Sequence, residues 1–160
     1  MCLKSEAMNL AVIMELPLVV LDVQRGGPGL GSIQPSQSDY WQATRAMGHG
    51  DFQVLVFAPS TVQEMADLAY LAFEKADEYR MPAMILSDGM LGQMMEPVVL
   101  PERVEQLPEK PWATTGHKGT RKHNIVDSLY LTADELERLN IERFERYETV
   151  KAREQRAETF

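Results

Sequence analysis

The sequence predicts an α/β fold built on a parallel sheet, and three observations lead to this prediction. Residues 16–24, 53–58 and 82–88 are apolar runs of strand length. Between the second and third runs, residues 62–76 place apolar side chains at three- and four-residue steps, with charged side chains on the opposite face. The order strand, helix, strand implies a right-handed crossover between parallel strands. We therefore expect one parallel sheet covered by helices.

The first element, residues 2–14, is apolar nearly all round, which predicts a buried helix. No Ser, Thr, Asp, Asn or Pro start signal precedes it. We therefore expect the chain to begin in the middle of a fold.

The strand predicted at residues 16–24 delivers Arg25 to a glycine-rich loop, residues 26–31. Such runs fit a parallel strand buried on both faces, and ligands of open α/β sheets bind beyond the carboxyl ends of strands. A guanidinium can grip a carboxylate with two parallel hydrogen bonds, and glycine lets the backbone approach a ligand. The alternative is a surface arginine at a strand end. The loop matches neither Gly-x-Gly-x-x-Gly nor a P-loop.

Local signals predict the helix starts that follow. Ser36 and Asp39 form a plausible capping pair for a short helix. Ser60 and Gln63 have capping-box spacing ahead of the amphipathic helix. Asp88, at the end of the third strand, is expected either to cap the next turn or to make a subunit contact.

The C-terminal part is predicted to be irregular and then helical. Four prolines in residues 97–111 indicate a connector, a cationic loop follows at 114–123, and 125–131 is a candidate short strand. Thr132 begins a capping box for a charged helix with a narrow apolar stripe, expected on a surface or against a partner. The predicted domain division is 1–96, 97–131 and 132–160.

Composition excludes several classes. A net charge of -8 argues against binding to a nucleic-acid backbone. No run approaches the roughly 20 apolar residues of a membrane span, and a secretory leader is absent from this sequence, so we expect a cytoplasmic protein. The single cysteine, Cys2, can form no internal disulfide and cannot hold an iron–sulfur cluster. Electron-transfer clusters would therefore lie on other chains.

Four motifs in consistent order carry a family resemblance. They are Asp22-Val-Gln-Arg-Gly-Gly-Pro, Gly48-His-Gly-Asp51, Ala58-Pro-Ser-Thr61 and Leu86-Ser-Asp-Gly-Met-Leu-Gly92. Over roughly residues 2–131, the chain resembles the α subunit of 2-oxoacid:ferredoxin oxidoreductases. The segments 27–31, 37–40 and 92–97 are most similar to the 2-ketoisovalerate type.

The resemblance implies a fold and a chemistry. The fold is a partial Rossmann-like thiamine-diphosphate-binding (pyrimidine) domain with a helical C-terminal extension. The chemistry is oxidative decarboxylation of a 2-oxoacid to an acyl-CoA. Thiamine diphosphate would be shared with a β subunit, while magnesium and iron–sulfur clusters would lie on other subunits. The implied partners are the β subunit, a ferredoxin-like subunit, ferredoxin and coenzyme A.

The resemblance also implies roles for residues of the glycine loop. Arg25 would bind the substrate carboxylate, Gly26 and Gly27 would line the cofactor cavity, and Leu30 and Gln34 would meet the substrate. The family's Ser-Thr-Gly-Leu-Pro-Thr run is replaced here by residues 29–34, so the polar contact of its last threonine falls to Gln34 or Ser32. Ile33, like Leu30, would suit a branched aliphatic tail or serve packing.

Two further roles, activation of the cofactor and proton transfer, would involve residues outside the glycine loop. The family's activating glutamate lies upstream of the matched part, and neither Glu6 nor Glu15 sits in its motif, so the chain is expected to be inactive alone. His49 is a candidate catalytic residue because imidazole transfers protons near neutral pH; a structural role in its turn is the alternative.

Three alternatives stay open at this point. The chain could be a non-catalytic assembly fragment, or it could act on 2-oxoglutarate or an aromatic 2-oxoacid. The basic cluster around His117 and His123 could hold a phosphate or an acidic partner, or form a solvated loop. No metal site is expected there, because no carboxylate or thiolate set lies nearby.

Overall fold

A parallel sheet of three strands in the order β1-β3-β2 organises the first part of the chain. The strands are β1 (Val19–Gln24), β2 (Leu55–Phe57) and β3 (Ala83–Asp88). In the register, Ala83 pairs with Val19 on one side and with Leu55 on the other. The sequence-based prediction of three parallel strands is therefore confirmed, with β2 shorter than expected.

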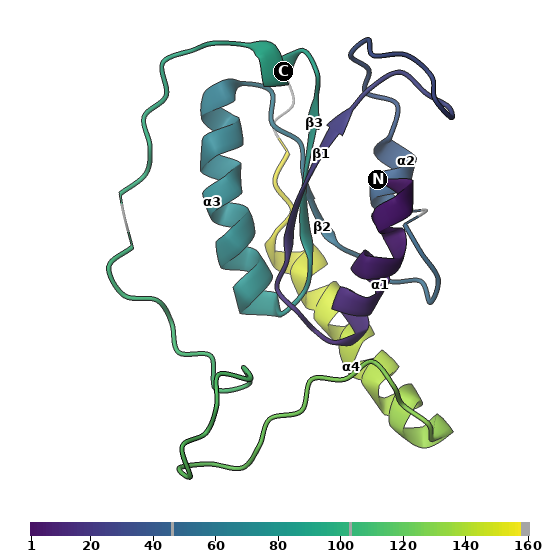
Figure 1. Ribbon diagram of the computed structural model, residues 1–160, viewed down its shortest axis with the longest axis vertical. Coiled ribbons are helices and arrows are strands. Elements are labelled where there is room, and N and C mark those ends of the chain that lie inside the picture. Colours follow the sequence, from purple (N-terminus) through teal and green to yellow (C-terminus); the bar gives the residue numbers. More distant parts are fainter. Residues whose placement is uncertain (46, 103, 158–160) are drawn as a thin grey trace. The chain divides into compact units, whose positions relative to one another are not determined.

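The computed structural model describes residues 1–45, 47–102 and 104–157. Two compact units are present, Met1–Asp127 and Ser128–Phe160, and each is described by itself (Figure 1). Residues 46, 103 and 158–160, which fall within the three segments predicted from the sequence, lie outside the described residues.

Helices cover both faces of the sheet. On one side lie α1 (Ser5–Ile13), preceded by the short 3-10 helix η1 (Cys2–Lys4), and α2 (Tyr40–Thr44); α3 (Val62–Tyr79) lies on the other side (Figure 1). The core cluster on the α1 and α2 side joins buried side chains from these helices, the following loop and β3: Met8, Ala43, Met47, Met84 and Leu86. The α/β class is confirmed.

The burial of β1 differs from the prediction. Leu21 is 57% exposed and Val23 is 48% exposed, whereas the side chains of β3 are buried from Ala83 to Ser87. The reason is topological: among the described residues β1 pairs only with β3, whereas β3 has a neighbour on each side. The prediction that β1 is buried on both faces was wrong. The strand that is buried in this way is the central strand, β3.

The first helix is likewise less buried than its composition suggested. Met8, Ala11 and Val12 of α1 are buried, but Leu3 is almost fully exposed and Leu10 is partly exposed. One face of α1 packs on the core cluster and the other faces outward. The all-round apolar pattern therefore predicted the helix correctly and its complete burial wrongly.

The start of α3 is capped one residue later than predicted. Thr61 is the N-cap, and its hydroxyl accepts the backbone N–H of Glu64 at 3.1 Å. The Glu64 carboxylate in turn accepts the backbone N–H and the hydroxyl of Ser60, each at 2.7 Å. Gln63, the predicted partner of Ser60, instead exchanges two hydrogen bonds with the backbone of Val99.

The predicted cap of α2 was also wrong. The Ser36 hydroxyl donates to Ser38, and Asp39 occupies the N-cap position without a side-chain capping bond. The backbone N–H of Asp39 donates to Oε1 of the buried Gln24 at 2.9 Å. This bond ties the entry of α2 to the end of β1.

After β3, a short 3-10 helix, η2 (Leu91–Gln93), leads into an irregular connector. Among the described residues from Met94 to Thr132 there is no helix or strand, so the strand predicted at 125–131 is not formed. The loop around the basic cluster is held by its own side chains: Arg121 donates to the carbonyls of Ala113 and Gly116, and Asn124 to that of Ala113.

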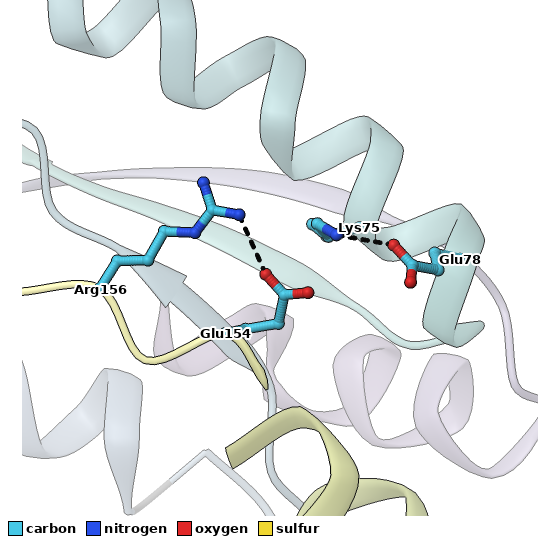
Figure 2. Close-up of polar contacts among 4 residues, drawn as sticks. All are labelled: Lys75, Glu78, Glu154 and Arg156. Atoms are coloured by element: carbon cyan, nitrogen blue, oxygen red, sulfur yellow. Dashed lines mark hydrogen bonds and ion pairs between the residues drawn. The ribbon is translucent and has the colours of Figure 1, made fainter. Parts of the chain in front are cut away.

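The second unit consists mainly of α4 (Ala133–Arg153), which confirms the predicted charged helix. Ion pairs between residues close in sequence occur in both units; Figure 2 shows Lys75 with Glu78 at 2.7 Å and Arg156 with Glu154 at 3.2 Å, one partner of each being partly covered. Within the described ranges, no helix has the length and apolar character needed to cross a bilayer.

Candidate functional site

The carboxyl ends of β1 and β3 lie side by side, since Gln24 pairs with Asp88 at the end of the register. The glycine loop follows β1, and the η2 turn follows β3. The two segments line an open pocket of about 530 Å³, a volume within the range of small-molecule sites. Its lining residues are Ile33, Gln34, Pro35, Met90, Gln93 and Met94.

Arg25 braces the glycine loop through one nitrogen. Its Nη1 donates to the carbonyl oxygens of Ser32 at 3.2 Å, of Gly26 at 3.4 Å and of Leu30. The outer edge of the guanidinium, Nε with Nη2, makes no hydrogen bond to any described residue. Because a carboxylate binds two parallel N–H donors, this edge suits a carboxylate ligand. Arg25 is exposed at the strand end, and its side chain also stabilises the glycine loop.

The backbone of the loop closes on itself. Arg25 and Pro35 form an antiparallel bridge, the N–H of Gly26 donates to the carbonyl of Gln34 at 2.9 Å, and the N–H of Ser32 donates to that of Gly26 at 2.7 Å. These bonds hold the returning part of the loop, residues 33–35, against the end of β1. Residues 33–35 form one wall of the pocket.

The structure places the predicted loop residues at different points. Gln34 lines the pocket. A Cβ added to Gly27 would meet nothing within 4 Å, so its backbone is open to an approaching molecule, whereas one on Gly26 would lie 3.4 Å from Ser32 Cβ. Leu30 is 93% exposed and is not among the lining residues; its carbonyl accepts from Arg25. The roles of these residues stay predictions.

Asp88 anchors the opposite wall. Its Oδ1 accepts the backbone N–H groups of Met90 at 2.8 Å and Leu91 at 3.0 Å, and its Oδ2 accepts Nε2 of Gln37 at 2.7 Å. The hydrogen bond from Gln37, followed by that from Leu91, lowers the pKa of the Asp88 carboxyl. The capping alternative for Asp88 is confirmed.

His49 lies away from this pocket along the chain's course. It sits in the turn that leads to the amino-terminal end of β2, while Arg25 follows the carboxyl end of β1. Its carbonyl accepts from Asn9 of α1 at 3.3 Å, and its ring forms no hydrogen bond with a described residue. This backbone contact fits the structural alternative. A catalytic role for His49 stays a prediction without geometric support.

The basic cluster is mostly engaged in shaping its own loop. Arg121 also donates to the carbonyl of Lys122 at 3.0 Å, and the rings of His117 and His123 stand edge to face with centroids 4.1 Å apart. This arrangement fits the solvated-loop alternative. Across the described residues, no group of three or more His, Cys, Asp or Glu side chains could hold a metal ion.

Pro35 on the glycine-loop wall was missed from the sequence, and so were three pocket residues that follow β3: Met90, Gln93 and Met94. The signal was available, since ligand sites form beyond the carboxyl ends of parallel strands and these residues follow β3 just as Arg25 follows β1. Only the pairing of β1 with β3 shows that the two ends face one site.

Comparison with known proteins identifies the family. Residues 1–159 match the sequence model of a family described as pyruvate flavodoxin/ferredoxin oxidoreductase, thiamine diphosphate-binding. The chain belongs to this family. This membership confirms the resemblance seen in the motifs, including the thiamine-diphosphate-binding character of the domain.

Individual relatives of the family point to two types of oxoacid. Ketoisovalerate oxidoreductase subunit VorB of Methanothermobacter marburgensis is 48% identical over 161 residues, covering 100% of this chain and 46% of the relative. The 2-oxoglutarate synthase subunit KorA of the same organism is 44% identical over 104 residues, covering 64% of this chain and 28% of the relative. The chain thus spans about half the length of the ketoisovalerate relative.

A solved structure supports the fold. A 2-oxoglutarate:ferredoxin oxidoreductase from Magnetococcus marinus superposes with a TM-score of 0.74 and 24% identity, covering 97% of this chain and 32% of that chain. That structure was determined with 2-oxoglutarate, coenzyme A and succinyl-CoA bound. At this identity, the likeness shows the fold alone.

The family's thiamine diphosphate fits the described residues only in part. The free guanidinium edge of Arg25, the open backbone at Gly27 and the pocket can meet an anionic substrate beside a cofactor ring. The glutamates of α1 and its end do not complete the site: Glu6 is exposed near the start of α1, and Glu15 pairs with Arg80 at 3.1 Å. Neither glutamate is therefore assigned as the activating carboxylate, and substrate binding by Arg25 stays a prediction.

Proposed function

We propose that the chain is part of the α subunit of a ferredoxin-dependent 2-oxoacid oxidoreductase. This enzyme decarboxylates a 2-oxoacid, 2-ketoisovalerate by preference, and transfers the acyl group to coenzyme A. The observation that carries the proposal is the outer edge of Arg25, which makes no hydrogen bond to the described residues. The Arg25 backbone pairs with that of Pro35, which lines an open pocket of about 530 Å³. The identity with two VorB subunits supports the choice of oxoacid.

The residues of this chain bind and orient the oxoacid. The outer edge of the Arg25 guanidinium, Nε with Nη2, holds the substrate carboxylate with two parallel hydrogen bonds. Nη1 meanwhile donates to carbonyls of the glycine loop and holds that loop in place. The Gln34 amide supplies a polar contact at the pocket wall. Holding a reactant in one orientation lowers the entropic part of the barrier. Thiamine diphosphate, when bound, supplies the carbanion chemistry.

The rest of the machinery belongs to partners in this proposal. A β subunit completes the thiamine diphosphate site with magnesium, and a ferredoxin-like subunit carries the iron–sulfur clusters, because one cysteine cannot hold a cluster. Ferredoxin accepts the electrons in the cytoplasm. The segments 1–96, 97–131 and 132–160 serve as half of the cofactor domain, a connector and a helical extension.

Reconstitution with the partner subunits tests the proposal. The complex should reduce methyl viologen with 2-ketoisovalerate and coenzyme A. Arg25→Ala should lower kcat/KM by about 100-fold or more, and Arg25→Lys should restore little, because an ammonium cannot form the two parallel bonds. Arg138→Ala, which removes an exposed ion pair with Glu142, is the matched control. Full activity of Arg25→Ala would overturn the carboxylate role.

The second candidate is a non-catalytic assembly fragment. The exposed apolar side chains of β1, Leu21 and Val23, and the exposed Leu3 favour it, because such surface is typical of interfaces. Size-exclusion chromatography with the partner subunits separates the two functions. Stable association without oxoacid-dependent dye reduction would support the assembly function, and dye reduction lost with Arg25→Ala would support the enzyme.

A further inference from the structure

We propose that Met90, Met94 and Ile33 are the specificity-determining residues of the pocket and select an aliphatic oxoacid tail over a tail that ends in a second carboxylate. The inference rests on the proposed function, in which Arg25 holds the carboxylate common to all 2-oxoacids. What differs among these substrates is the other end of the molecule. The pocket beside the glycine loop is where that end would lie.

The chemistry of the lining supports this selection. Four of the six lining residues are apolar, Gln34 and Gln93 contribute neutral amides, and no lysine, arginine or histidine occurs among the described residues of the lining. A carboxylate that leaves water without a cationic partner loses its hydration and gains no opposite charge. A branched aliphatic tail loses nothing polar on entering and buries apolar surface. The lining thus favours 2-ketoisovalerate and disfavours 2-oxoglutarate.

The two methionines suit a branched tail for a second reason. A thioether chain is unbranched and flexible, so it adapts to irregular apolar shapes. Met90 is 65% exposed and Met94 is 41% exposed in this chain, so both retain apolar surface that a ligand can cover. Ile33, 90% exposed on the opposite wall, faces the same pocket. The pocket therefore has apolar surface on both walls.

Several contacts hold the two walls in place. Asp88 caps the turn that bears Met90, and the N–H of Met94 donates to the carbonyl of Leu91 at 3.2 Å. On the other side, a Cβ added to Gly89 would lie 3.6 Å from Cγ of Pro35, so the turn after β3 passes within contact distance of the glycine-loop wall. A substitution at Met94 therefore changes the pocket's chemistry on a fixed frame.

A cation introduced into the pocket tests the inference in the reconstituted complex. Met94→Lys should lower the ratio of kcat/KM for 2-ketoisovalerate to that for 2-oxoglutarate by about 10-fold or more, the effect of one charge-assisted hydrogen bond. Met95→Lys is the matched control, because Met95 is 95% exposed and does not line the pocket. It should leave the ratio unchanged, and Met94→Leu should keep the preference for 2-ketoisovalerate.

The outcomes separate this inference from the proposed function. An unchanged ratio in an active Met94→Lys complex, or an equal shift with Met95→Lys, would overturn the specificity role and leave the proposed function intact. A wild-type complex that turns over no 2-oxoacid would overturn both. If Met94→Lys fails to assemble, Met90→Lys, at a more exposed position of the same wall, decides the question by the same ratio.

Discussion

Gln37 Nε2 donates to Asp88 Oδ2 at 2.7 Å, and this bond joins the segment after the glycine loop to the end of β3. The same carboxylate holds the N–H groups of Met90 and Leu91. One side chain therefore fixes both the turn that carries a pocket wall and the segment behind the other wall. The relative position of the two walls depends on Asp88.

The first prediction concerns the charge of Asp88. Its hydrogen bonds lower its pKa, so the stability it contributes is present above the unfolded-state pKa and is lost as pH falls through the folded-state value. Asp88→Asn keeps the shape and removes the charge. We expect a loss of about 1 kcal/mol in urea unfolding at pH 7.

The difference in stability between wild type and this variant should shrink as pH falls from the unfolded-state pKa of about 4 through the lower folded-state pKa, because the wild-type carboxyl then becomes protonated. Gln37→Ala is the companion variant, because it removes the largest cause of the lowered pKa. A double-mutant cycle measures their coupling. A stability difference between wild type and the Asp88→Asn variant that is constant with pH would contradict the role of the charge.

Local patterns predicted those parts of the fold that depend on neighbouring residues. The apolar run of β3 and the two-faced pattern of α3 correspond to elements found in the structure, because burial and periodicity are encoded within each segment. The capping partners were harder to predict. Glu64 rather than Gln63 completes the cap of α3, since the Gln63 amide pairs with the distant Val99, a contact that no local pattern contains.

Some residues around the pocket could likewise be predicted from local sequence, and others depend on the tertiary fold. Arg25 and its loop stand out in the sequence because a cation and glycines follow an apolar run. No local sequence pattern distinguishes Met90 and Met94. They line the pocket only because β3 pairs with β1. The exposure of Leu21 has the same origin, since strand order decides which strand is at the edge.

The second prediction concerns Asp22, which is partly buried in β1. Its Oδ2 makes no hydrogen bond with a described residue. Burial raises its pKa; the chain's terminal amino group opposes this shift, and Asp39 adds to it. The native state therefore holds this proton more tightly than the unfolded state, and stability falls as pH rises from the unfolded-state pKa to the folded-state pKa.

Asp22→Asn removes the cost of burying a charge, so we expect greater stability than wild type at pH 7. The gain should diminish as pH falls toward about 4, because protonated Asp22 no longer carries that cost. Urea unfolding across this range measures it. A variant that is less stable than wild type at pH 7 would show that the charged form has a stabilising partner.

The third prediction concerns the cap of α3. Thr61→Ala removes the hydroxyl that accepts the N–H of Glu64, and loss of an N-cap costs about 1 kcal/mol. Ser60→Ala is the comparison, because Glu64 keeps its bond to the backbone N–H of residue 60. We expect a smaller loss for this variant in thermal unfolding. Equal losses would mean that the Ser60 hydroxyl stabilises the start of α3 as much as the Thr61 cap does.

The last prediction concerns two glycines of the loop that Arg25 braces. Gly29 and Gly31 both have positive φ, at 67° and 48°. A Cβ on Gly31 would lie 1.9 Å from the carbonyl oxygen of Gly26, whereas one on Gly29 would meet nothing within 4 Å. Gly29→Ala therefore bears only the cost of the left-handed conformation, about 1–2 kcal/mol.

Gly31→Ala adds a clash with the backbone at a point where the Gly26 carbonyl accepts from Ser32 and Arg25. We expect this variant to displace Arg25 and to lower oxoacid-dependent dye reduction by the reconstituted complex about as far as Arg25→Ala does. Gly29→Ala should retain most of the activity. Because the two variants share the conformational cost, the difference in activity between them measures the effect of disrupting the closed loop. If both variants retain most of the activity, catalysis does not require the loop to close.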